Sequence, residues 1–104
     1  SKAWDVLGLQ LETVAEGEIR LVSSRYRGGL RVTSVRADGP AAAQGIRSGD
    51  VLVGMHIWET VSLENISYIL GRPAIENLQP VKFYIVRGSE TLYGHMRVSL
   101  RTGE

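Results

Sequence analysis

Residues 29–54 read GLRVTSVRADGPAAAQGIRSGDVLVG, and this stretch decides the fold. Its first run, 30–36, mixes aliphatic and β-branched residues with arginine and stops at an Asp-Gly-Pro sequence, which is typical of a strand followed by a turn. The segment 40–45 begins with proline and closes on glycine, residues that suit the first turn and the end of a short helix. The run 51–58 is apolar on both faces, which predicts a strand near the centre of a sheet.

The flanking segments complete an α+β pattern. Residues 6–11 predict a first strand with a glycine near its start, and 12–27 is irregular enough for a short helix or a long connection. Residues 62–70 have helical spacing behind a serine N-cap, and 81–100 reads as a closing hairpin. Strands with helices on one side favour a partly closed antiparallel β-barrel or sandwich of five to six strands, capped by two helices.

Length and composition describe one ordinary globular domain. The chain has 104 residues, of which 43% are hydrophobic and 22% charged. We expect a single domain over residues 1–100 and an unpatterned tail over 101–104, in a piece of a longer protein because the first residue is not Met. The net charge of +1 is too small to indicate a nucleic acid or a membrane surface as partner. No apolar stretch is long enough for direct membrane insertion.

The sequence lacks the residue patterns of an enzyme or a metal site. It contains no cysteine, and Ser48 lies in a turn without a nucleophile motif. His56 and His95 are far apart and lack metal-ligand spacing, so we expect no metal, no cofactor and no catalytic residue in this chain. A basic stretch with one tyrosine gives a weak nucleic-acid alternative; its arginines are Arg20, Arg25, Arg27, Arg31 and Arg36.

The stretch 29–54 resembles the core signature of PDZ domains. A strand, a Gly-Pro-Ala turn, a short Ala-rich helix closing on Gly-Ile, and a Gly-Asp followed by an aliphatic strand occur in order and without gaps. The order of all elements is similar to the permuted strand order of bacterial PDZ domains. Those domains are best known as appendages of HtrA-type trypsin-like serine proteases, so the resemblance implies an upstream protease domain in the same chain.

The resemblance also implies a peptide-binding site. Val6-Leu7-Gly8-Leu9 matches the loop that receives a peptide's terminal carboxylate, through the N–H groups of its last three residues. The peptide would add as a strand beside Leu9-Gln10-Leu11, facing a helix stripe at i, i+4 and i+7. The expected peptide-binding residues are Val6, Leu7, Gly8, Leu9, Gln10, Leu11, Leu63, Ser67 and Leu70. Of these, Leu7, Leu9 and Leu70 would surround the last side chain, which should be apolar.

The function expected from the resemblance is recognition of apolar C-termini or extended segments, in the periplasm or cell envelope. Its partners would be peptides or protein C-termini and a protease domain of the same chain. Two alternatives stay open: a PDZ domain of another envelope protease or secretion scaffold, or a purely structural contact module. The segment 57–60 departs from the tight turn of relatives, and Trp58 either packs on the core or marks a second contact surface.

Overall fold

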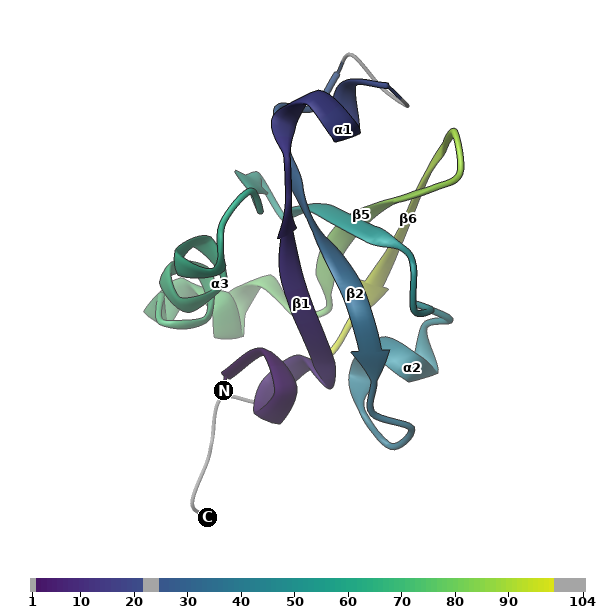
Figure 1. Ribbon diagram of the computed structural model, residues 1–104. Helices are drawn as coiled ribbons and strands as arrows, with labels where there is room; N and C mark the ends of the chain where they lie inside the picture. The colour runs from purple at the N-terminus through teal and green to yellow at the C-terminus, as the bar shows by residue number, and fades with distance from the viewer. Residues whose placement is uncertain (1, 22–24, 99–104) are drawn as a thin grey trace.

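The computed structural model describes residues 2–21 and 25–98, and the expected tail over 101–104 lies outside this part of the chain. Its elements, shown in Figure 1, are η1 (Ala3–Leu7), β1 (Leu9–Val14), α1 (Glu16–Arg20), β2 (Gly29–Val35), α2 (Pro40–Ala43), β3 (Val51–Met55), β4 (Trp58–Glu59), α3 (Leu63–Leu70), η2 (Pro73–Leu78), β5 (Val81–Arg87) and β6 (Glu90–Met96).

The strands form one antiparallel sheet in the order β1-β2-β3-β5-β6, with the short β4 paired to β3. The α+β expectation is confirmed: the sheet has six strands, and it stays open rather than closing into a barrel. In Figure 1, α3 flanks β1, α2 lies near the end of β2, and α1 follows the far end of β1. Because the sheet is open, β1 is one of its two edges.

The strand β3 is buried on both faces, as its sequence predicts. Leu52 and Met55 enter the main core together with Ile66 and Ile69 of α3. Val51 and Val53 enter a second, smaller cluster with Ile19 of α1. Successive side chains of a strand point to opposite faces, so a strand this apolar belongs between two packed layers.

The expectation that this strand runs to Trp58 is wrong. It ends at Met55, because His56 adopts a φ of +55°, a left-handed conformation that turns the chain. The His56 N–H donates to the Lys82 carbonyl at 2.7 Å, which ties the turn to the neighbouring β5. The turn therefore occupies His56 and Ile57 instead of 57–60, and Trp58 begins β4.

Two further segments differ from their sequence-based expectations. Val6 and Leu7 belong to η1 rather than to the first strand, which begins only at Leu9. The irregular segment 12–27 first continues β1 to Val14 and then forms α1. The closing hairpin is confirmed as β5 and β6, which end at Met96, and residues 99–100 lie outside the described part.

A buried ion pair fixes the start of β3. The Asp50 carboxylate, 2% exposed as a residue, accepts two hydrogen bonds of 2.8 Å from the Arg87 guanidinium and one from the Arg47 backbone N–H. Burial opposes ionisation of Asp50, yet these donors together hold its pKa below the usual range. Arg87 also donates to the Gly45 carbonyl at 3.0 Å, so one side chain joins β5, β3 and the end of the α2 segment.

Candidate functional site

A groove lies between the free edge of β1 and the helix α3. It has a volume of about 490 Å³, and residues of η1 line part of it. Its lining side chains are largely apolar, which is the usual character of a site that takes up apolar groups. The lining residues are Lys2, Ala3, Trp4, Gln10, Leu11, Leu63, Ile66 and Ser67.

The backbone of β1 offers hydrogen-bonding groups to this groove. The Arg36 N–H donates to the Gly8 carbonyl at 2.8 Å, which makes Leu9 and Val35 a pair without mutual hydrogen bonds. The N–H and C=O of Leu9 therefore point away from β2. Because these directions alternate along a strand, the N–H and C=O of Leu11 point to the same free edge.

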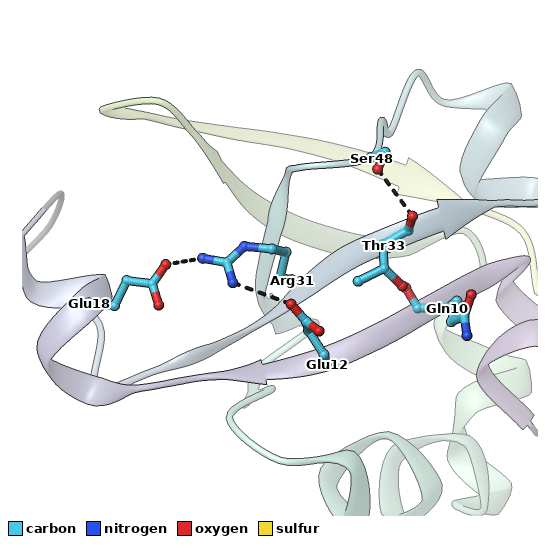
Figure 2. A network of polar contacts seen from close by, with 6 residues as sticks. All are labelled: Gln10, Glu12, Glu18, Arg31, Thr33 and Ser48. Atoms are coloured by element: carbon cyan, nitrogen blue, oxygen red, sulfur yellow. Dashed lines mark hydrogen bonds and ion pairs between the residues drawn. The ribbon is translucent and has the colours of Figure 1, made fainter.

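Polar contacts on the side of β2 hold β1 in register. The pairing shifts between Gln10 and Leu11, so Thr33 is an extra residue in β2, and its hydroxyl donates to the Gln10 carbonyl at 3.2 Å. Figure 2 shows this bond beside an ion-pair network in which Arg31 contacts Glu12 of β1 and Glu18 of α1. These contacts hold β1 on the side that faces β2, while the opposite edge of β1 has no neighbouring strand among the residues that the structure describes.

The opposite wall is α3, whose start is set by a capping box. The Ser62 hydroxyl accepts from the Asn65 N–H at 3.3 Å, and the Asn65 side chain accepts from the Ser62 N–H at 3.0 Å. This cap fixes the helix phase, so that Leu63 and Ser67 face the groove while Ile69 is fully buried. Ile66 serves both sides, since it belongs to the core and also lines the groove.

The nine expected site residues divide into four that line the groove, four in the main core, and Gly8. Gln10, Leu11, Leu63 and Ser67 line the groove. The side chains of four others belong to the main core: Val6, Leu7, Leu9 and Leu70. Gly8, with a φ of +77°, lies between η1 and β1, and its N–H donates to the Trp4 carbonyl at 3.1 Å.

Sequence reasoning missed the contribution of η1. Lys2, Ala3 and Trp4 line the groove, and none of the three is among the site residues expected from the sequence. The available signal was the i, i+4 spacing of Ala3 and Leu7, which places both on one face of a helical turn. Both side chains are buried in the core and anchor the turn there, although Leu7 was expected to belong to a strand.

The described residues were also compared with the other functions considered from the sequence: a metal site, a serine nucleophile, nucleic-acid binding and membrane insertion. Within residues 2–21 and 25–98, no group of three or more His, Asp and Glu side chains is placed to hold a metal ion. The Ser48 hydroxyl donates to the Thr33 carbonyl at 3.2 Å (Figure 2). Four arginines of the basic stretch form ion pairs with acidic side chains; they are Arg20, Arg27, Arg31 and Arg36. In the same ranges, no helix has the length and apolar character needed to cross a membrane.

Comparison with known proteins gives one sequence relative and several structural ones. No model of a known protein family matches the chain. It is 31% identical over 93 residues to a protein of Halomonas elongata named "Probable periplasmic serine endoprotease DegP-like". The match covers 89% of this chain and 19% of that protein, so the chain spans about a fifth of its relative's length.

Two solved structures have the same fold. The HtrA3 PDZ domain, bound to a phage-derived ligand of sequence FGRWV, gives a TM-score of 0.67 at 18% identity, over 89% of this chain and 83% of that one. The HtrA-type protease AlgW, solved with a decapeptide, gives a TM-score of 0.66 at 22% identity, over 94% of this chain and 30% of that one. At these identities the likeness establishes the fold.

Proposed function

We propose that this chain, a PDZ domain of the HtrA-type kind, binds extended peptides by adding them as a strand to β1. The observation that carries the proposal is the free edge of β1, which faces an apolar groove instead of another strand. An exposed strand edge is a ready template for a further strand.

The main chain of the ligand would be held by Leu9 and Leu11. Both present their N–H and C=O groups at the free edge, so an added strand can complete the ladder there. Such bonds use only backbone groups of the ligand and therefore carry no sequence preference. A ligand strand bound between β1 and α3 would form a sixth ladder of the sheet, and the edge of β1 would no longer be unpaired.

Selectivity would come from the side chains of the groove. Leu11, Leu63 and Ile66 offer apolar surface, which favours apolar residues at alternate ligand positions. Gln10 and Ser67 add polar atoms at the rim. The loop 6–9 would lie beside the C-terminal part of the bound segment, and the core residues Leu7, Leu9 and Leu70 would pack beneath that part.

For the whole protein we propose a regulatory or substrate-recognition role. The relative from Halomonas elongata is named a periplasmic serine endoprotease, and the chain spans about a fifth of it. By that likeness, this domain would belong to a bacterial HtrA-like serine protease, deliver peptides to a protease domain of the same chain, and work in the periplasm. The catalytic residues would then lie in that other domain.

The test begins with ligands selected by this domain from a random peptide library, followed by an amide-shift titration of the labelled domain. We expect shifts in Leu9–Leu11 and in Leu63–Ser67. Leu63→Asp, on the groove wall, should weaken binding about tenfold or more, because it replaces roughly 1.5 kcal/mol or more of apolar contact with a charge. Tyr68→Asp, on the outer face of the same helix, is the matched control and should leave affinity within about twofold.

One observation favours the structural-contact alternative. Tyr68, Arg72 and Trp58 stack on the side of α3 away from the groove, with the Arg72 guanidinium 5.1 Å from the Tyr68 ring centre and 5.3 Å from that of Trp58. Ile57, 78% exposed, extends from the adjacent turn. If this surface carries the function, Tyr68→Asp will abolish association with the partner domain and Leu63→Asp will not.

A further inference from the structure

The amide group of Gly8 is already engaged within the protein. Its N–H lies at the end of η1 and donates to the carbonyls of Ala3 and Trp4, the latter at 3.1 Å. A terminal carboxylate needs several backbone N–H groups that converge on it. In this conformation the central donor of the expected loop 7–9 points into its own helical turn, so a carboxylate would have to displace the Trp4 carbonyl.

The surroundings of the loop oppose that displacement. The Arg36 N–H donates to the Gly8 carbonyl at 2.8 Å, and the Arg36 guanidinium donates to the Asp5 carbonyl at 3.3 Å. Behind the loop, a Cβ on Gly8 would lie only 3.1 Å from the Gly39 Cα, which shows how closely the two backbones pack. One arginine therefore holds both ends of the short segment that would have to rearrange.

The positively charged side chain near the loop 7–9 is that of Arg36, and it already has an acidic partner within the protein. Arg36 forms an ion pair with Asp38 at 2.9 Å and does not line the groove. Among the described residues that line the groove, Lys2 alone is charged, and its side chain is exposed. An exposed lysine is a screened point charge that adds little to the binding of a carboxylate. By contrast, the ladder groups of Leu9 and Leu11 require no carboxylate at all.

We infer that the groove selects internal extended segments of a partner protein, with apolar residues at alternate positions, and gains little from a free C-terminus. This inference rests on the proposed strand addition and specifies its ligand. The bound chain would continue past η1, over Lys2 and Trp4, rather than end at Gly8.

The decisive comparison uses the 104-residue chain and two random heptapeptide libraries on phage, one with a free C-terminus and one with the heptamer embedded between fixed flanks. The strongest binders are then synthesised as free acid, as amide, and with three further residues at the C-terminus. We expect both libraries to yield binders and the three forms to bind within about threefold of each other. A free acid that binds ten times more tightly than its amide and its extended form overturns the inference while leaving strand addition standing. Failure of both libraries refutes strand addition itself, and the inference with it.

A pair of variants tests the cause. Asp5→Pro disfavours the helical conformation of Trp4, which precedes it, and so moves the Trp4 carbonyl away from the Gly8 N–H. Asp5→Ala removes the same carboxylate and keeps the turn. The ratio of free-acid to amide affinity should rise at least fivefold in Asp5→Pro and stay unchanged in Asp5→Ala. The amide peptide's affinity for Asp5→Pro shows that the variant is folded, and an unchanged ratio in that folded variant contradicts the reasoning.

Discussion

Replacing Arg87 with methionine should destabilise the fold by about 3 kcal/mol at neutral pH. The change removes two charge-assisted hydrogen bonds of 2.8 Å to Asp50, each of which contributes about 1.5 kcal/mol. It leaves the Asp50 carboxylate buried with a hydrogen bond from the Arg47 N–H, and loss of one partner of a buried pair costs about 3–5 kcal/mol in other proteins. Methionine has a similar length and fills much of the same space.

The destabilisation should depend on pH in one direction. The pKa of Asp50 is lower in the native protein than the value of about 3.9 for an unfolded aspartate. A carboxylate with a depressed native pKa stabilises the fold above its unfolded pKa, and this contribution is lost as the pH falls through the native value. The difference between wild type and Arg87→Met should therefore be constant above about pH 5 and shrink below about pH 4.

Urea unfolding at a series of pH values measures this difference. Arg31→Met is the control, because Arg31 pairs with two largely exposed glutamates, Glu12 and Glu18, and should change the free energy of unfolding by about 0.5 kcal/mol. If Arg87→Met and Arg31→Met have equal effects, or if the effect of Arg87→Met is the same at pH 3 and pH 7, the buried pair is not the source of stability.

Three further variants test packing and capping by thermal and urea unfolding. Thr60→Val removes a buried hydroxyl that donates to a β3 carbonyl at 2.8 Å, and should destabilise by about 1–2 kcal/mol; no change would mean that the carbonyl finds another donor. Ser62→Ala deletes the acceptor of the Asn65 N–H and should lower stability by about 1 kcal/mol, a result that equal stability would refute. Gly94→Ala places a Cβ 2.8 Å from the Phe83 ring and should destabilise by about 1–3 kcal/mol, unless the ring moves freely.

The central part of the fold was predictable because its signals are local. The stretch 29–54 contains its own turn residues, and the apolar character of β3 at successive positions indicates burial on both faces. The end of that strand was not predictable in this way. A positive φ at His56 is uncommon for a residue with a side chain, and it depends on a hydrogen bond to Lys82, a partner far away in the sequence.

The groove, too, has parts that local sequence signals predict and parts that depend on tertiary contacts. Gln10 and Leu11 on one wall, and Leu63 and Ser67 on the other, follow from strand alternation and helical spacing. The spacing of Ala3 and Leu7 is compatible with a helical turn but does not decide it, because a five-residue turn is stable only through the core that its apolar side chains join. The same turn decides whether the Gly8 N–H is available to a ligand or bonded to the Trp4 carbonyl. The preference for a ligand with or without a free C-terminus therefore depends on tertiary structure and could not be predicted from the sequence.

The position of the groove between a strand edge and a helix has a consequence for the kinds of protein that could enter it. The free edge of β1 lies beside α3, so a single extended chain fits between them, whereas a folded sheet or a helix does not present a strand with unpaired backbone on both sides. On the proposed function, binding to the groove would depend more on whether the partner segment is extended and unpaired than on its amino-acid composition. A loop that opens briefly or a chain that has lost its native structure would qualify, and the same sequence in a folded domain would be ignored.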